Sequence, residues 1–384
     1  MNKNKEKVPK IRFPGFTEPW EQRKLGDMCD EFKSGSSILA KDICEQGEYP
    51  VYGGNGLRGY TATYNHDGIY ALIGRQGALC GNMNKVYGKA YFTEHAVAVK
   101  ANKNNNTDFL FFLLDKMNLR QYSGQSAQPG LAVNKLIELI TLVPNCSEQK
   151  LIGIFFNKLD NLITLHQRKL NHLKDKKKGL LQKMFPKNGE LVPELRFPEF
   201  TDPWEQRKVG EFLTESKIKG SDGSKAKKLT VKLWRKGIVP KEEIYQGSSA
   251  TQYYVRKSGQ FMYGKLDFLN QAFGIVPPEL DGYESTLDSP AFDFKDGINS
   301  GFFLEYISLK RFYKYQGNTA NGSRKAKRIH ADTFFEMPIS VPRHDEQKKI
   351  GSFFQNIDNL ITLHQRKLDH LKEQKKALLQ QMFI

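Results

Sequence analysis

The chain has 384 residues, and its 59 Lys and Arg against 42 Asp and Glu give a formal net charge of +17. With 39% hydrophobic and 26% charged residues, it has a globular composition, which excludes a wholly disordered chain. No apolar run approaches the ~18 residues that a membrane helix needs, and the first ten residues contain no apolar signal core, so we expect a cytoplasmic protein. The positive excess favours a polyanionic partner, of which nucleic acid is the most obvious.

Two segments of the chain occur twice. The first, PKIRFPGFTEPWEQRKLGD at residues 9–27, returns at 193–211 with 13 of 19 positions identical. The second, residues 143–185, returns at 341–383 with 30 of 43 identities, including eleven consecutive residues, DNLITLHQRKL. Repeats of this kind indicate how the whole chain is organised.

Two inserts, 28–142 and 212–340, lie between the repeats and share almost no sequence. Gene duplication alone does not explain why the inserts diverged while the flanking segments stayed nearly constant. Two different tasks explain it better. We infer that the repeated segments hold something common and that each insert does something distinct.

The second repeated block predicts two long helices with matching apolar seams. Pro144 and Pro342 precede candidate N-caps at Ser147 and Asp345. Apolar residues then recur at steps of four and three, as in a coiled coil. The first seam comprises Leu159, Ile163, His166, Leu170, Leu173, Lys177, Leu180 and Met184. The second comprises Ile357, Ile361, His364, Leu368, Leu371, Lys375, Leu378 and Met382.

Matching seams should pack on each other, and the length of the second insert indicates their direction. A helix of 37 residues is about 55 Å long, whereas a domain of ~140 residues spans roughly 35–40 Å. The insert therefore connects the two helices more easily if they are antiparallel. We expect globular domains at 1–146 and 186–344, at opposite ends of a spacer made of helices 147–185 and 345–384, with a pseudo-two-fold axis.

The sequences of the inserts predict a mixture of helices and strands. The fold class that we expect is therefore α+β (mixed α/β). Alternating or apolar stretches bounded by Gly and Asn predict strands at 68–74, 90–100 and 259–264. Amphipathic patterns predict helices at 108–117 and 300–315.

Catalytic and metal-binding motifs are missing from the sequence. It contains no G-x-x-x-x-G-K-[ST] loop, no H-E-x-x-H helix and no G-x-G-x-x-G between a strand and a helix. The four cysteines form no CxxC pair, which excludes a disulfide framework and a standard zinc ribbon and indicates reduced, mostly buried thiols. His66 and His95 each lie near an acid, but no nucleophile motif accompanies them. We therefore expect no catalytic residue, metal or cofactor in this chain.

Several loops of the inserts carry side chains suited to reading DNA bases. Arg forms bidentate bonds with guanine, whereas Asn and Gln form them with adenine. The candidates in the first insert are Asn55, Arg58, Arg75, Gln76, Gln125 and Gln128. Those in the second insert are Lys265, Asn318, Asn321, Arg324, Lys325, Lys327 and Arg328. The cluster at 324–328 is the strongest candidate for contact with phosphate.

The positive charge is unevenly distributed along the chain. The first insert has 11 basic and 10 acidic residues, and the second has 20 and 14. Residues 150–185 have 9 basic and 2 acidic residues, including Lys176-Lys177-Lys178. This lysine run is either a solvated helix face, a contact with phosphates or a contact with an acidic partner.

The repeated blocks, RFPGFTEPWEQRKLG with RFPEFTDPWEQRKVG and the helices whose first copy begins EQKLIGIFFNKLDNLITLHQRKL, resemble the specificity subunit of Type I restriction–modification systems over the whole chain. The resemblance implies that each insert is a target recognition domain for one half of a bipartite, asymmetric sequence in double-stranded DNA. It implies that the helices set the spacing of the halves and dock two copies of the modification (methyltransferase) subunit, in a complex with restriction subunits. S-adenosylmethionine, ATP and Mg would belong to those partners.

Two other functions remain open. A free-standing bivalent DNA-binding regulator would share the spacer and the two domains, but it would not need eleven identical residues on both helices. A nucleic-acid-modifying enzyme would show methyl transfer or cleavage by the purified chain alone.

Overall fold

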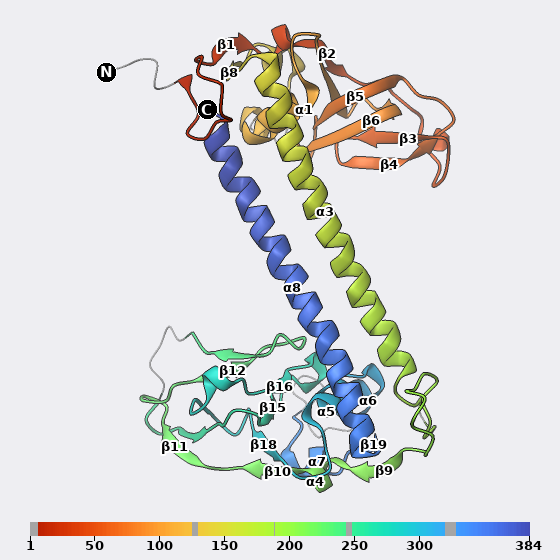
Figure 1. Cartoon of the computed structure of the whole chain (residues 1–384), viewed down its shortest axis with the longest axis vertical. Helices are drawn as coiled ribbons and strands as arrows, with labels where there is room; N and C mark the ends of the chain where they lie inside the picture. The colour runs from red at the N-terminus through yellow and green to blue at the C-terminus, as the bar shows by residue number, and fades with distance from the viewer. Residues whose placement is uncertain (1–6, 125–129, 188, 243–247, 319–327) are drawn as a thin grey trace. The chain divides into compact units, whose positions relative to one another are not determined.

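The chain folds into two compact units. The computed structural model describes residues 7–124, 130–187, 189–242, 248–318 and 328–384. Unit 1 comprises Met1–Arg168 and Gln365–Ile384, and unit 2 comprises Lys169–His364. Figure 1 labels the larger helices and many of the strands of both units.

Unit 1 is built around a six-stranded sheet with the order β2-β7-β5-β6-β3-β4. Its strands are β2 (Cys29–Ser34), β3 (Tyr49–Gly53), β4 (Gly56–Thr61), β5 (His66–Gly74), β6 (Met83–Phe92) and β7 (Ala96–Ala101). The first predicted strand is confirmed as β5, whose side chains alternate between faces. Ala71 and Ile73 pack in the same core as helix α1 (Thr107–Lys116), and Tyr70 and Leu72 pack on the other face. Burial of both faces explains the apolar run in the sequence.

Unit 2 contains a four-stranded sheet, β10-β18-β15-β16, whose order matches β2-β7-β5-β6. Its strands are β10 (Leu213–Ser216), β15 (Phe261–Tyr263), β16 (Phe273–Ile275) and β18 (Ala291–Phe294). Further strands are β11 (Lys219–Asp222), β12 (Leu229–Val231), β13 (Ile238–Pro240), β14 (Gln252–Val255) and β17 (Glu284–Ser285). The strand predicted at 259–264 is confirmed as β15. The two inserts therefore share a core topology that their sequences conceal, and they differ in the strands added to it (Figure 1).

The helices of the inserts follow the same chain order. Helices α1 and α2 (Val133–Ile137) of unit 1 correspond to α5 (Ser300–Ile307) and α7 (Ala331–Phe335) of unit 2. Asparagine side chains cap both α1 and α5. Asn106 accepts the backbone N–H of Phe109 at 2.9 Å, and Asn299 accepts the backbone N–H of Phe302 at 3.0 Å. The other short helices are α4 (Val209–Phe212), α6 (Lys310–Asn318), η2 (Gly26–Met28), η3 (Ala40–Asp42), η4 (Leu119–Tyr122), η5 (Phe268–Asn270) and η6 (Pro278–Leu280).

Two predicted elements are wrong in extent. The strand expected at 90–100 is interrupted by a turn in which the N–H of Ala96 donates to the carbonyl of Thr93, so β6 ends and β7 begins inside it. The helix expected at 300–315 breaks at Ser308, whose hydroxyl donates to the carbonyl of Leu304. The break allows aromatic residues of both α5 and α6 to be buried in one core, which a single straight helix with one apolar face does less well.

The first repeated segment anchors each insert to the long helices. In unit 1, β1 (Glu21–Lys24) pairs with β8 (Ile140–Val143), and in unit 2, β9 (Glu205–Lys208) pairs with β19 (Pro338–Val341). Trp20 is buried just before β1 and packs edge-on against two phenylalanines. Its cluster comprises Trp20, Phe109, Phe156 and Phe383. The matching cluster of unit 2 comprises Trp204, Phe302, Phe354 and Phe185.

Each unit also contains a bidentate ion pair between the two repeated blocks. Arg12 donates to both carboxylate oxygens of Glu148 at 2.7 and 2.8 Å, and Arg196 donates to both oxygens of Glu346 at 2.8 and 2.7 Å. The two glutamates are almost completely buried. Planar guanidinium groups suit such sites because they bind carboxylates in a fixed fork geometry.

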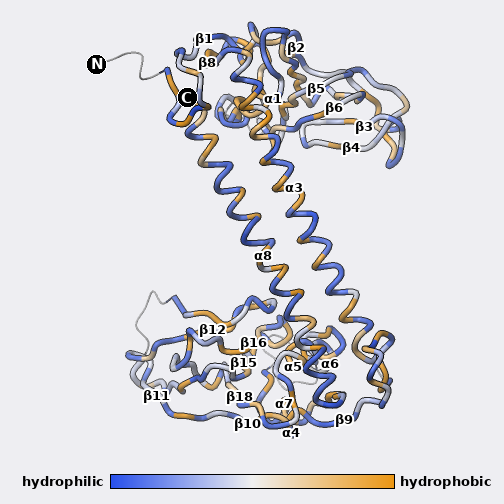
Figure 2. The backbone as a smooth tube through the Cα atoms, viewed as in Figure 1, coloured by the Kyte–Doolittle hydropathy of each residue, from blue (hydrophilic) through white to orange (hydrophobic). Residues whose placement is uncertain are grey.

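The second repeated block forms α3 (Cys146–Lys183) and α8 (His344–Met382). Both helices begin one residue before the predicted N-caps, and the side chain of Asn145 accepts the N–H of Glu148 at 3.0 Å. All predicted seam residues are buried or half-buried, and Figure 2 shows apolar residues recurring along both helices. The mixed helix-and-sheet fold class is confirmed.

Within each unit the two helix segments are antiparallel, as predicted. In unit 1 the end of α8 contributes Met382 to the core that contains Ile152 from the start of α3. In unit 2 the end of α3 contributes Leu180 to the core that contains Ile350 from the start of α8. The lysines that interrupt the seams are paired across the helices, at 2.7 Å from Lys375 to Asp160 and from Lys177 to Asp358. The arrangement is the same in both units.

The four cysteines are free, with Cys80 buried, Cys29 and Cys146 half-buried and Cys44 exposed. Within the described ranges, no helix is both long and apolar enough to cross a membrane.

Candidate nucleic-acid interface

Arg75 and Lys265, predicted from unrelated sequences, occupy the same position in the two units. Arg75 follows Gly74 at the end of β5, and Lys265 follows Gly264 after β15. The carbonyl of Arg75 accepts the N–H of Leu131 at 2.9 Å, and the carbonyl of Lys265 accepts the N–H of Ile329 at 3.0 Å. Each cationic residue therefore stands where the central strand of its sheet meets a returning segment of the insert.

In unit 1 four of the predicted residues lie in two neighbouring segments, the β3–β4 hairpin and the loop after β5. Asn55 and Arg58 lie in the β3–β4 turn and on β4, both exposed, and Arg75 and Gln76 lie in the loop after β5. A Cβ on Gly74 would come within 2.5 Å of the carbonyl oxygen of Gly54 in the turn, so only glycine permits this close approach. Gln76 is exposed and forms a β-bridge with the backbone of Gly130. Gln125 and Gln128 lie outside the described residues.

In unit 2 the structure brings together Lys265 and Arg328. The carbonyl of Asp288 accepts the N–H of Lys265 at 2.9 Å, and its carboxylate accepts from Arg328 at 3.1 Å. Arg328 is exposed and Lys265 is half-buried. Asn318 is exposed at the end of α6, and Asn321, Arg324, Lys325 and Lys327 lie outside the residues that the structure describes.

Arg256, which the sequence did not single out, holds the turn that carries Asp288. It is fully buried and donates to the hydroxyl of Ser285 at 2.7 Å and to the carbonyl of Ser216 at 3.0 Å. Its second terminal nitrogen faces the carbonyls of Thr286 and Ser289 at 3.4 Å. Burial lowers the pKa of Arg256 to about 10, which still leaves it charged at neutral pH. Only the fold reveals this role, because the residues that it joins are far apart in sequence.

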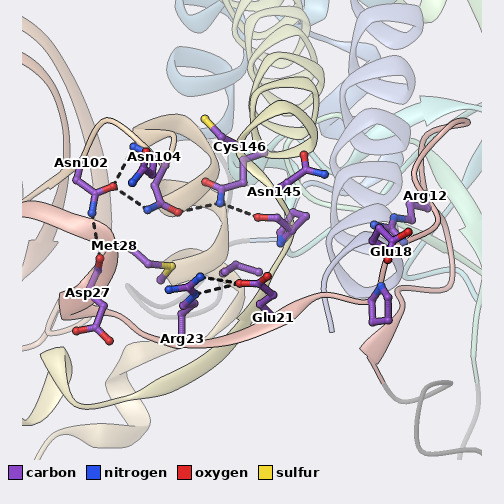
Figure 3. A pocket seen from close by; sticks show the side chains of 15 residues that line it. Arg12, Glu18, Glu21, Arg23, Asp27, Met28, Asn102, Asn104, Asn145 and Cys146 are labelled. Atoms are coloured by element: carbon purple, nitrogen blue, oxygen red, sulfur yellow. Dashed lines mark hydrogen bonds and ion pairs between the residues drawn. The ribbon is translucent and has the colours of Figure 1, made fainter.

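A polar pocket of about 650 Å³ in unit 1 lies where the first repeat meets the start of α3 (Figure 3). Its side chains bond to one another. Asn102 donates to the carbonyl of Asp27 at 3.0 Å, and Gln149 donates to Asn105 at 2.9 Å. No cluster of His, Cys, Asp and Glu able to hold a metal occurs in the described part of the chain. We interpret the pocket as a structural junction between repeat and insert.

The two helices expose the same pair of leucines. Leu162 and Leu165 on α3 and Leu360 and Leu363 on α8 are between 45% and 61% exposed, and both pairs belong to the identical eleven-residue segment. Leucines at this spacing share one helix face. An exposed apolar surface that occurs twice is typical of a site for a partner that binds twice.

Known proteins resemble the chain in sequence and in fold. The Type I restriction enzyme EcoprrI specificity subunit of Escherichia coli is 46% identical over 146 residues, which is 37% of this chain and about a third (36%) of that protein. The Type I restriction enzyme MjaVIII specificity subunit of Methanocaldococcus jannaschii is 23% identical over 412 residues, covering 96% of this chain and 92% of the relative. The S subunit of a Type I restriction–modification system from M. genitalium has the same fold, with a TM-score of 0.66, 14% identity and coverage of 98% and 99%.

A family model described as the Type I restriction modification DNA specificity domain matches residues 17–175 and 291–373. These ranges include most of both copies of the long repeated helix and more than half of the chain. The chain therefore belongs to the family of Type I restriction–modification specificity subunits.

Proposed function

We propose that this chain reads a bipartite, asymmetric DNA sequence, one half with each insert, and performs no catalysis itself. The proposal rests on one observation: the two inserts share a sheet topology, but the loops proposed to contact DNA bases differ between them. Arg75 and Lys265 stand at corresponding strand ends, but the loops around them differ in sequence and length. A protein that read two identical half-sites would need no such difference.

The side chains at these loops suit the major groove. Arg and Lys bind the O6 and N7 of guanine, and Asn or Gln binds adenine. Unit 1 offers Arg58, Arg75, Asn55 and Gln76, whereas the described candidates of unit 2 are Lys265, Arg328 and Asn318. Each half of the target would therefore be read by a different set of donors and acceptors.

The repeated surfaces support a complex with two copies of one partner. We propose that two modification subunits dock on the repeated helices and that restriction subunits join the same assembly. S-adenosylmethionine, ATP and Mg would be bound by those subunits. Because a base inside the duplex is unreachable, methylation requires its extrusion, and the pocket that receives it would lie in the modification subunit.

Exchange of one insert tests the division of the target. Replacing residues 212–340 by the corresponding insert of a different specificity subunit should change one half of the methylated sequence and leave the other half and the gap unchanged. Methylome sequencing of cells carrying each version measures this. If both halves changed together, the assignment of one half to each insert would be wrong.

Single substitutions at the strand ends should alter one half-site each. We expect Lys265→Ala to cost about 1–3 kcal/mol of discrimination at one base pair, the usual contribution of a direct base contact, while the other half is read as before. Arg75→Ala should have the same effect on the other half. Lys257→Ala is a matched control, because this exposed lysine lies just before the start of β15 rather than after its end. Binding of duplexes with single-base changes measures the difference, and equal effects of Lys257→Ala and Lys265→Ala would contradict the assignment.

Placing a charge on an exposed leucine should release one partner copy. We expect Leu363→Glu to weaken the docking of one modification subunit by about 2 kcal/mol or more, as for a central interface residue. Leu165→Glu should weaken the docking of the other copy. Leu39→Glu is the control, because Leu39 is as exposed as Leu363 but lies outside the repeats. Mass measurement of the complex should show loss of one copy with each helix variant, and two retained copies in both would refute the docking site.

A further inference from the structure

Unit 2 contains a groove of about 900 Å³ between the last turns of α3 and helix α6. Its apolar floor includes Leu181, Leu309 and Ile361. Its walls carry seven cationic side chains, Lys174, Lys177, Lys178, Arg235, Lys310, Arg311 and Lys314. No Asp or Glu occurs among its described lining residues.

Two of these cations, Arg235 and Lys177, form ion pairs with acidic residues that do not line the groove. Arg235 donates to both oxygens of Glu305 at 3.0 and 2.7 Å, and Lys177 bonds to Glu305 at 2.9 Å and to Asp358 at 2.7 Å. Burial opposes the ionisation of Glu305, but the attraction and hydrogen bonds of Arg235 and Lys177 outweigh it, so the pKa of Glu305 is lowered. The charge that faces the groove therefore comes from the remaining five cations.

Four of the remaining five cations form two rows. Lys174 and Lys178 are one turn apart on α3, and Lys310 and Lys314 are one turn apart on α6. Residues at this spacing share a helix face and lie about 6 Å apart along the axis. All four are exposed. On α6, next to Lys310, the Nη2 atom of Arg311 is buried and has no hydrogen-bond partner within the described structure.

The α6 wall of the groove comes from the second insert, and it has no counterpart among the described residues of unit 1. The lysines of α3 recur on α8 as Lys372 and Lys376. The place of α6 in unit 1, however, is taken by η4 (Leu119–Tyr122), which is four residues long and has a single basic residue, Arg120. A partner that docks in the same way on both units would need the groove in both. The occupant must therefore be something that the two units contact differently.

We propose that this groove binds the sugar–phosphate backbone of DNA next to the half-site read by the second insert. Gln271 lines the groove, and the next residue, Ala272, accepts the N–H of Gly264, which precedes Lys265, at 2.9 Å. The groove is thus continuous with the loop proposed to read bases. Rows of lysines without acids suit phosphates, which position the protein without specifying sequence. This inference rests on the proposed function.

The test compares matched lysine pairs in the full-length chain assembled with its modification subunits. The groove variant carries either the pair K174Q and K178Q or the pair K310Q and K314Q, and the control carries the pair K372Q and K376Q, the repeat equivalents of Lys174 and Lys178. Two duplexes are compared, one with the sequence that the complex methylates and one of random sequence. The affinity for each is measured over a range of salt concentrations. All six lysines are exposed, so loss of folding is not expected.

The groove variant should bind both duplexes more weakly by the same factor, on the order of tenfold or more. Its slope of log affinity against log salt should fall by about 1 for each phosphate that the protein no longer neutralises, and the control should match the wild type. A wild-type slope in the groove variant would overturn the proposal, as would loss of modification-subunit binding with unchanged DNA affinity. Equal wild-type affinity for target and random duplex would instead refute the proposed function.

Discussion

Replacing Trp204 by alanine should lower the free energy of unfolding of unit 2 by about 3–5 kcal/mol, the usual cost of truncating a buried aromatic residue. Trp204 is 1% exposed and packs against Phe185 at 5.9 Å and Phe302 at 5.6 Å between ring centroids. Phe185 lies two residues after the end of α3, and Phe302 lies in the second insert. Removing the indole leaves a cavity where the repeat, the helix and the insert meet. We therefore expect loss of the half-site read by the second insert as well as loss of stability.

Trp234 provides a matched control for this substitution. It is 57% exposed, so Trp234→Ala should change the free energy of unfolding by no more than about 0.5 kcal/mol. Chemical denaturation followed by circular dichroism measures both variants. Similar stability losses at the two tryptophans would contradict the anchoring role of Trp204. Trp20→Ala should reproduce the loss in unit 1, because Trp20 occupies the same position there.

Breaking the buried ion pair of unit 2 is expected to have an effect of similar size. Glu346 is 0% exposed, and Arg196→Met removes the two hydrogen bonds that it accepts from the guanidinium group. Removal of one partner from a buried pair leaves an uncompensated charge and costs about 3–5 kcal/mol. The same measurement of chemical denaturation applies, and the start of α8 should lose protection from hydrogen exchange.

Two further variants separate the ion pair from general effects of charge. Glu205→Gln removes a carboxylate from an exposed pair with Arg207 and should cost less than about 1 kcal/mol. The double variant Arg196→Met with Glu346→Leu should recover most of the stability, because apolar residues of similar size can replace a buried pair. A double variant as unstable as Arg196→Met alone would show that packing, rather than the unpaired charge, causes the loss.

The repeats explain why the long helices could be predicted from the sequence. Their seams follow an apolar period of three and four residues. Such a period depends only on residues that are close in sequence, so it can be recognised without knowing how the inserts fold. The lysines at 177 and 375 interrupted that period without an apparent reason. The structure supplies one, since each pairs with the aspartate that begins the identical eleven-residue segment on the other helix.

The common topology of the inserts could not be predicted in this way. Sheet order depends on hydrogen bonds between residues far apart in sequence, and side-chain alternation alone does not specify strand partners. The correspondence of Arg75 and Lys265 is seen only when the hydrogen bonds from Leu131 and Ile329 are known. The role of Arg256 was hidden for the same reason, because its hydrogen-bond acceptors come from segments that are distant in sequence.

Methylome sequencing of the host with and without this chain is the sharpest test that the chain directs methylation to a bipartite DNA sequence. We expect one asymmetric, gapped methylation motif to disappear when the gene is deleted and to return when it is restored, with all other motifs unaffected. An unchanged methylome in a host with active modification subunits would contradict it, as would loss of a continuous or palindromic motif.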